Sequence, residues 1–307
     1  MCVDCGCSDQ AKATMTNINT GSVVDLATGL ATPAQGDHRH GPNDHHEHGH
    51  EHGHHHHDHG HSHDAHDHSH DGHDHGHQHD HLHGDHNHGN IVSLQQSILA
   101  KNDSLAERNR AWLAGREVLM LNLVSSPGSG KTSLLERTIR DLGSEIGITV
   151  IEGDQATLND GARIAAAGAP SVQVNTGTGC HLEADMIEKA LQELKPRPGT
   201  VVFVENVGNL VCPSLFDLGE RAKVAILSVT EGEDKPLKYP HMFKAAELVI
   251  VNKTDLLPHL DLDIDELVAS ARAVNPTVEV IQLSAKTGEG LTQWYDWLRR
   301  HLAEAQE

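Results

Sequence analysis

The chain has 307 residues and a formal net charge of −21, with 29 histidines and 3% aromatic residues. No stretch has the clustered Lys and Arg of a nucleic-acid-binding face, so nucleic acid is excluded as an expected partner. There is neither an apolar run of about 18 residues nor a signal-peptide pattern at Met1, and we expect a soluble, cytoplasmic protein without a membrane partner.

The composition changes near Asn90 and divides the chain into three expected parts. Residues 1–37 form a cysteine-rich tip with a linker, residues 38–90 form a histidine-rich tract, and residues 91–307 have the composition of an ordinary globular domain. About 215 residues are enough for one substantial core. The sequence therefore predicts one folded domain behind a long N-terminal tail.

Three of the five cysteines, Cys2, Cys5 and Cys7, form a C-x-x-C-x-C motif. An odd number of cysteines without an export signal argues against a disulfide framework. Closely spaced thiolates can converge on one soft or borderline metal ion, whereas a redox pair would be expected within a βαβ unit, which is missing here. We interpret the motif as a metal site, with a redox role or no role as the alternatives, and residues 8–37 as linker.

Histidine occupies 25 of the 51 positions from His38 to His88, mostly with Asp, Gly and Glu between them. Leu82 is the one apolar side chain larger than alanine, so the tract cannot bury enough surface to offset the entropy of ordering itself. Imidazole binds nickel, copper and zinc well, and such tracts are typical of metal binding. We predict a disordered metal-binding tract. A solvated spacer or an expression tag is the alternative.

From Ile91 onward, apolar runs alternate with segments of helical periodicity. The spacing of apolar residues over 91–114 predicts one or two helices before the core. Apolar strands separated by helices predict βαβ units, and hence an α/β fold with a mainly parallel sheet that is covered by helices on both faces. The expected strands are 118–124, 148–151, 171–174, 200–204, 224–229, 248–251 and 278–283, and the expected helices are 132–142, 160–167, 182–194, 264–273 and 291–302.

The first expected strand runs into S-S-P-G-S-G-K-T at 125–132. A strand, a loop of small residues and a helix that opens with Lys-Thr are the setting of a phosphate-binding loop, as in P-loop NTPases. Lys131 is expected to reach the β- and γ-phosphates, and the Thr132 hydroxyl to hold Mg²⁺. The loop begins with Ser125, where the usual pattern has glycine. The expected nucleotide-binding residues are Gly128, Ser129, Gly130, Lys131, Thr132 and Ser133.

Two motifs after later strands indicate which base is bound. In N-K-T-D at 252–255, the Asp255 carboxylate can accept hydrogen bonds from guanine N1 and from its 2-amino group, which adenine cannot offer. In S-A-K at 284–286, a backbone N–H can reach guanine O6, with Lys286 against the base. We predict a GTPase whose base pocket contains Asn252, Lys253, Asp255, Ser284, Ala285 and Lys286.

Further motifs are E-G-D at 152–154, T-G-T-G-C-H-L at 176–182 and E-N-V-G-N-L-V-C-P at 205–213. With the phosphate loop, N-K-T-D and the cysteine tip, they resemble the P-loop GTPases that dimerise around their nucleotides and serve in metallocentre assembly. The chain is most similar to the hydrogenase-maturation nickel GTPases, the HypB family. The resemblance covers the globular part and the cysteine tip. In some members of that family a histidine tract resembles a nickel store.

The resemblance implies that Asp154 and Glu205, each after a strand, organise Mg²⁺ and the attacking water. With Lys131 they would be the catalytic residues for hydrolysis of GTP to GDP. The usual D-x-x-G is here E-N-V-G at 205–208, and no obvious catalytic Gln follows. The water-positioning residue therefore stays open, and slow unaided turnover is expected. The family also implies a homodimer that forms with GTP.

By the same resemblance, Cys180, His181 and Cys212 form a second metal motif. Adjacent residues rarely chelate one ion, so we expect the ion to lie between two copies of the chain. Ni²⁺ and Zn²⁺ both suit these ligands, and the residues do not choose between them. The alternative is a small buried cysteine beside a polar histidine.

The implied function is a GTP-hydrolysing nickel metallochaperone that stores nickel and delivers it to the hydrogenase large-subunit precursor, together with a maturation partner. A urease accessory GTPase is the neighbouring alternative. That family carries Cys-Pro-His, however, whereas Ser214 follows Cys212-Pro213 here. A nickel-storage protein with a vestigial nucleotide domain is the third possibility, and the intact Lys131 and Asp255 speak against it.

Overall fold

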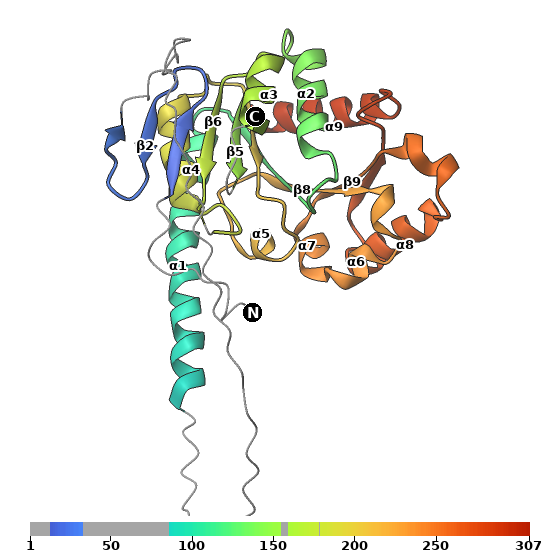
Figure 1. Ribbon diagram of the computed structural model, residues 1–307, viewed down its shortest axis with the longest axis horizontal. Coiled ribbons are helices and arrows are strands. Elements are labelled where there is room, and N and C mark those ends of the chain that lie inside the picture. Colours follow the sequence, from blue (N-terminus) through green and yellow to red (C-terminus); the bar gives the residue numbers. More distant parts are fainter. Residues whose placement is uncertain (1–12, 33–85, 155–158, 178) are drawn as a thin grey trace, which may run out of the picture. The chain divides into compact units, whose positions relative to one another are not determined.

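A computed structural model describes residues 13–32, 86–154, 159–177 and 179–307, with the backbone alone for residues 32 and 86–95. The described strands form one sheet in the order β10-β9-β8-β4-β7-β5-β6-β1-β2-β3 (Figure 1). The seven strands from β10 to β6 are parallel, which confirms the expected α/β class. The strands are β1 Thr14–Asn17, β2 Val23–Asp25, β3 Ala31–Thr32, β4 Leu119–Ser125, β5 Ile148–Asp154, β6 Ser171–Asn175, β7 Val201–Glu205, β8 Ala222–Ser228, β9 Leu248–Asn252 and β10 Glu279–Gln282.

Helices cover both faces of this sheet, because each buried strand presents apolar side chains on both sides. One core lies between the strands and α2, α3 and α9, with Trp294 and Trp297 at its centre. On the other face α1 and α4 cover β5 and β6, and α7 and α8 cover β8 and β9. The helices are α1 His86–Ala114, α2 Lys131–Leu142, α3 Asn159–Ala167, α4 Ala184–Leu194, α5 Cys212–Leu215, α6 Lys235–Lys238, α7 Pro240–Ala245, α8 Ile264–Val274 and α9 Leu291–Ala305, with 3-10 turns η1 Val229–Glu231 and η2 Thr254–His259.

The expected strands and helices of the globular part are confirmed, with ends that differ by a few residues. The segment before the core is one helix, α1, and it begins at His86, so the last residues of the predicted disordered tract are helical. The rest of that tract and the cysteine tip lie outside the described residues. None of the described helices is both long and apolar enough to cross a membrane.

The prediction of a linker over residues 8–37 is wrong for residues 14–32. This segment forms β1, β2 and β3, and β1 pairs antiparallel with β6. Met15 and Leu26 are buried in the core beside α4. The physical reason is that β6 would otherwise be an edge strand, and edge strands have unpaired backbone groups that accept an added strand.

The turn between β10 and α9 carries the predicted base-binding residues Ser284, Ala285 and Lys286. Gly290 has φ +73°, and a Cβ placed there would lie 2.1 Å from the Gln282 carbonyl oxygen. The Ser284 N–H donates to the Glu289 carbonyl at 2.9 Å, which closes the same turn. Glycine at position 290 is therefore required by both the backbone conformation and the close approach of the chain.

We expect Gly290→Ala to lower the free energy of unfolding by about 3 kcal/mol or more, because the added methyl group must displace backbone atoms. The matched control is Gly168→Ala, where φ is +106° but a Cβ would meet nothing within 4 Å. That variant should lose only the conformational cost of about 1 kcal/mol. Urea unfolding of both variants measures the difference. Equal losses would contradict the role assigned to the close contact.

Candidate nucleotide and metal sites

The predicted phosphate loop connects β4 to α2 at the carboxyl edge of the sheet. Gly130 has φ +98°, and a Cβ there would lie 2.5 Å from Asn252 Nδ2, so glycine is needed for this close packing. Lys131 is buried in the loop, and its Nζ donates to Ser125 Oγ at 2.7 Å. Ser125 stands where the usual phosphate-loop pattern has glycine, and its hydroxyl thus holds the ammonium group of Lys131. Burial lowers the pKa of Lys131, and the nearby Glu205 opposes that shift.

Three carboxylates line the wall opposite this lysine. Thr132 Oγ1 donates to Glu205 Oε1 at 2.7 Å, as expected if both groups serve one cation. Glu152 is paired with Glu205 across neighbouring strands, and Asp154 ends β5 two residues later. Glu205 is fully buried, and burial raises its pKa. Burial, followed by the charges of Glu205 and Asp154, raises the pKa of Glu152 to about 9.

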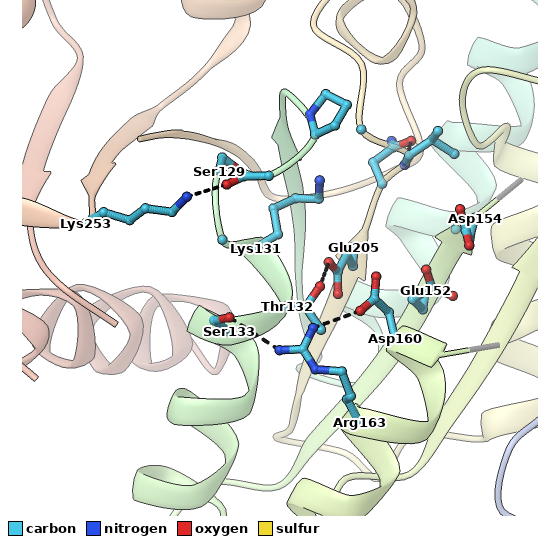
Figure 2. A pocket seen from close by; sticks show the side chains of 17 residues that line it. Ser129, Lys131, Thr132, Ser133, Glu152, Asp154, Asp160, Arg163, Glu205 and Lys253 are labelled. Atoms are coloured by element: carbon cyan, nitrogen blue, oxygen red, sulfur yellow. Dashed lines mark hydrogen bonds and ion pairs between the residues drawn. The ribbon is translucent and has the colours of Figure 1, made fainter. Parts of the chain in front are cut away.

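These groups line a cavity of about 510 Å³ that the phosphate loop closes on one side (Figure 2). Figure 2 also shows Asp160 pointing into it beside Thr132 and Glu205. Arg163, one turn later on α3, donates to Asp160 at 3.0 Å and to Ser133 Oγ at 3.3 Å. Sequence reasoning missed Glu152, Asp160 and Arg163 as site residues. A charged residue inside the buried strand β5 was the available signal for Glu152.

The predicted base-binding motifs meet beside the same loop. Asn252, Lys253, Asp255, Ala285 and Lys286 line a second cavity of about 500 Å³, which shares Gly130, Ser133 and Lys253 with the first. Ser284 Oγ donates to Asp255 Oδ1 at 2.6 Å, while Lys286 Nζ lies 4.0 Å from Asp255 Oδ2. The second carboxylate oxygen therefore faces the lysine and the cavity.

Asn252 joins the phosphate loop to the base-binding loop. Its Nδ2 donates to the Ser129 carbonyl at 3.0 Å, and its Oδ1 accepts from Ala285 N at 3.1 Å and from Lys253 N at 2.8 Å. Lys253 adds a 2.6 Å hydrogen bond from Nζ to the Gly128 carbonyl. Both side chains thus connect the two loops, so Asn252 and Lys253 have a structural role in addition to the base-binding role predicted for N-K-T-D.

Cys180, His181 and Cys212 come together in a single chain. One ligand atom from each lies within 4.8 Å of the other two, and Cys180 Sγ is 3.6 Å from His181 Nδ1. The imidazole stacks on Phe216 with ring centroids 3.8 Å apart, and its Nε2 lies 3.6 Å from Glu183 Oε1. The neighbouring His181 lowers the pKa of Glu183. Two sulfurs and an imidazole at this spacing are a set of donors suited to nickel or zinc.

This arrangement corrects one step of the sequence argument. We expected adjacent Cys180 and His181 not to serve one ion within a chain, and the structure brings them and Cys212 to one point. The T-G-T-G-C-H loop turns at Thr176, whose Oγ1 donates to the Gly179 carbonyl at 2.7 Å. One chain can therefore supply three ligands without a partner. That two copies of the chain share an ion stays a prediction.

The chain is similar to proteins of one family over most of its globular part. A family model described as CobW/HypB/UreG, nucleotide-binding domain, matches residues 119–282. The hydrogenase maturation factor HypB of Azotobacter vinelandii is 60% identical over 210 residues, which cover 68% of this chain and 69% of that relative. This chain belongs to the HypB family. Its identity with HypB of Escherichia coli K12 is 58% over 208 residues, 68% of this chain and 72% of that relative.

Two solved HypB structures share this fold. HypB of Archaeoglobus fulgidus is 39% identical with a TM-score of 0.63, and the match covers 66% of this chain and 100% of that one. HypB of Helicobacter pylori in complex with nickel is 36% identical with a TM-score of 0.62, covering 66% of this chain and 96% of that one. The HypB family that the motifs indicated is thus confirmed, and the solved HypB structures share its fold.

The residues around Thr132 fit a bound Mg²⁺. Glu205 Oε2 and Glu152 Oε2 are buried without a hydrogen-bond partner among the described atoms, and so is Ser129 Oγ in the phosphate loop. Buried polar atoms without partners are costly unless a ligand satisfies them. Carboxylate and hydroxyl oxygens are the ligands that magnesium prefers. In this HypB-family chain the three buried oxygens without hydrogen-bond partners therefore belong to residues that line the cavity where phosphate and cation are expected.

We predict that the Glu152 carboxyl makes the nucleotide-free protein less stable as pH rises. Its pKa is about 9 in the folded chain and near the ordinary 4.5 when unfolded, so the folded state holds more protons throughout that window. Stability is then lost as pH rises from about 4.5 to 9. Glu152→Gln, which stays neutral, should gain about 4 kcal/mol over wild type between pH 5 and pH 8. Glu266→Gln, at an exposed site on α8, should follow wild type.

The measurement is urea unfolding in EDTA, so that neither Mg²⁺ nor metal on the histidine tract contributes. The difference between variant and wild type is the informative quantity, since other histidines and carboxylates titrate in both. A difference that is independent of pH would show that Glu152 is ionised in the folded chain.

Proposed function

We propose that this chain is a GTP-hydrolysing nickel metallochaperone that delivers nickel to the hydrogenase large-subunit precursor in the cytoplasm. The observation that carries the proposal is a direct contact between its two sites. Asn206 lines the nucleotide cavity, and its Oδ1 accepts from the backbone N–H of Leu182, the residue after His181, at 3.3 Å. Gly153, inside E-G-D, packs so closely on Leu182 that a Cβ would lie 2.8 Å from its side chain.

GTP hydrolysis to GDP and phosphate is supported by the groups around the first cavity. Lys131 and the N-terminus of α2 place positive charge at the β- and γ-phosphates, where negative charge develops in the transition state. Thr132, Glu205 and Asp154 would hold Mg²⁺, which neutralises phosphate charge when bound. Asp154 and Glu205 would also orient water, and Asp160 faces the same space (Figure 2).

The proposed selection of guanine is tested at Asp255. In Asp255→Asn, the amide can donate where the carboxylate accepted, so preference should move from GTP towards xanthosine triphosphate by about 100-fold or more. Competition binding of the two nucleotides measures this change. Ser284→Ala, which removes the neighbouring hydroxyl but keeps the carboxylate, is the control and should retain GTP preference. An Asp255→Asn protein with wild-type preference would show that the base lies elsewhere.

Nickel is proposed as cargo for Cys180, His181 and Cys212, with zinc as the competing ion. The Helicobacter pylori structure that resembles this chain holds nickel, which supports the choice. The histidine tract and the Cys2, Cys5 and Cys7 tip are proposed as further nickel sites, the tract as a store. Dimer formation with GTP, and a second maturation protein as partner, are part of the proposal.

Metal and nucleotide affinities should be coupled through Asn206. Two ligands that favour the same state must raise each other's affinity by equal factors. We expect nickel to bind at least about fivefold more tightly with a non-hydrolysable GTP analogue than with GDP. The measurement uses a chain without residues 38–85 and with serine at positions 2, 5 and 7, which keeps β1–β3. Asn206→Ala should remove the coupling but retain the metal ligands, whereas Cys180→Ala should remove binding. Equal nickel affinities with GDP and with the GTP analogue would contradict the proposal that the bound nucleotide controls nickel release.

A role in urease maturation has one observation in its favour. The Helicobacter hepaticus relative, 37% identical over 217 residues, is a hydrogenase/urease maturation factor by name. Deleting the gene and assaying hydrogenase and urease separately, with and without added nickel, separates the two functions. Loss of hydrogenase activity alone supports the main proposal.

A further inference from the structure

The two ring nitrogens of His181 lie beside different groups. Nδ1 is 3.6 Å from Cys180 Sγ, one of the two sulfurs of the metal cluster. Nε2 is 3.6 Å from Glu183 Oε1, and it is buried without a hydrogen-bond partner among the described residues. A neutral imidazole has one nitrogen that can bind a metal ion and one that carries a proton and donates. The ring is therefore placed between a set of metal ligands and a carboxylate.

Stacking on Phe216 fixes the plane of this ring. The ring centroids are 3.8 Å apart, and the planes differ by 29°. Phe216 is itself held from the core, because its carbonyl accepts from Lys223 Nζ at 3.0 Å and Lys223 pairs with the buried Glu220. A half-turn of the imidazole about its bond to Cβ would keep the stacking but exchange each nitrogen with a carbon. Stacking alone therefore does not determine which edge of the ring faces Cys180.

The Glu183 carboxylate is available to select that edge because another residue caps α4. Glu183 is the N-cap of this helix, with φ −115° and ψ 159°, but its side chain makes no capping hydrogen bond with the described helix. The N-cap is usually Ser, Thr, Asp or Asn, whose side-chain oxygen accepts from the first turn. Here Asn102 of α1 supplies that oxygen, since its Oδ1 accepts from Ala184 N at 2.9 Å. The Glu183 carboxylate can then face His181.

We propose that Glu183 is a positioning residue for the metal cluster, which accepts a hydrogen bond from His181 Nε2–H and so presents Nδ1 to the ion. The inference rests on the proposed function in taking Cys180, His181 and Cys212 as the cargo site. The 3.6 Å separation exceeds that of an N–H···O hydrogen bond, about 2.9 Å, so the carboxylate closes a gap of about 0.7 Å when the ion binds. A carboxylate behind a ligating imidazole fixes the proton on the far nitrogen and makes the near one a stronger ligand.

The test measures nickel affinity in the full-length chain with serine at positions 2, 5 and 7, which is the parent chain for the variants. Cys180 and Cys212 are then the remaining cysteines, so thiolate-to-nickel absorption reports their site alone. The probe is Ni²⁺ in competition with a chelator of known affinity. The histidine tract competes equally in every variant, so the ratio of affinities between variants is the informative quantity.

Glu183→Ala should lower nickel affinity by about 10- to 100-fold, because the imidazole loses its orienting partner. Glu183→Gln keeps an oxygen that can accept from Nε2–H but lacks the charge, so its affinity should fall between those of Glu183→Ala and the parent. The matched control is Asp185→Asn, which removes a negative charge from the first turn of the same helix, where Asp185 pairs with Lys189 at 3.4 Å. The control should stay within about twofold of the parent. Urea unfolding in EDTA should give one midpoint for all these chains, because the Glu183 side chain is 43% exposed.

Nδ1-methylhistidine at position 181 tests the ligand atom, because its methyl group occupies the side of Nδ1 that would bind the ion. This chain should bind nickel as weakly as His181→Ala does. Parent-like affinity in the methylated chain, or equal affinities of Glu183→Ala and Asp185→Asn, would overturn the positioning role. Absence of thiolate-to-nickel absorption from the parent chain itself would instead count against the proposed cargo site.

Discussion

The buried side-chain amide of Asn252 is the interaction on which the nucleotide pocket depends. It satisfies the Ser129 carbonyl on one side and the Ala285 N–H on the other, so a single group fixes the distance between the phosphate loop and the base loop. The amide is 1% exposed, and removal of either partner would leave a buried polar group without a hydrogen bond. The absence of a side chain at Gly130 follows from this contact, because the amide occupies the space that a Cβ would take.

A second amide, that of Asn206, supports the loop that carries Cys180 and His181. Asn206 follows the last residue of β7, donates to Asn122 at 3.2 Å and accepts from Leu182. Parallel strands end at one edge, and short polar side chains there satisfy the loops that leave neighbouring strands. The nucleotide cavity and the Cys180 cluster are consequently parts of one hydrogen-bonded edge. Glu205 precedes Asn206 and His181 precedes Leu182, so one hydrogen bond connects the residues next to both groups.

Much of this could be predicted from the sequence, because the parallel strands are continuous apolar runs and the motifs follow them. Glu152, Asp160 and Arg163 were missed because their role depends on which strands are neighbours, and Glu152 meets Glu205 only through the β5–β7 pairing. The strands at residues 14–32 were missed although the signal was present. Asn17 and Asp25 each accept hydrogen bonds from backbone N–H groups two and three residues on, and each is followed by Thr-Gly with glycine at positive φ. Strands this short, with few apolar residues, resemble a linker in the sequence. They are recognised as strands only when the neighbouring sheet edge, here β6, is known.

β3 and the part of α1 that follows Val92 belong to the same folded unit, and residues 33–85 lie between them in the sequence. On the α1 side, Asn102 and Asn109 hold the helix through hydrogen bonds to the segments around Ala184 and Leu218. Closing a flexible loop costs a free energy that grows with the logarithm of its length, about 0.6 kcal/mol for each doubling. A tract that lacks a core, as its composition predicts, could therefore double its number of histidines for less than one hydrogen bond's worth of stability. The length and histidine content of this tract can then vary between related chains without any change in the described fold.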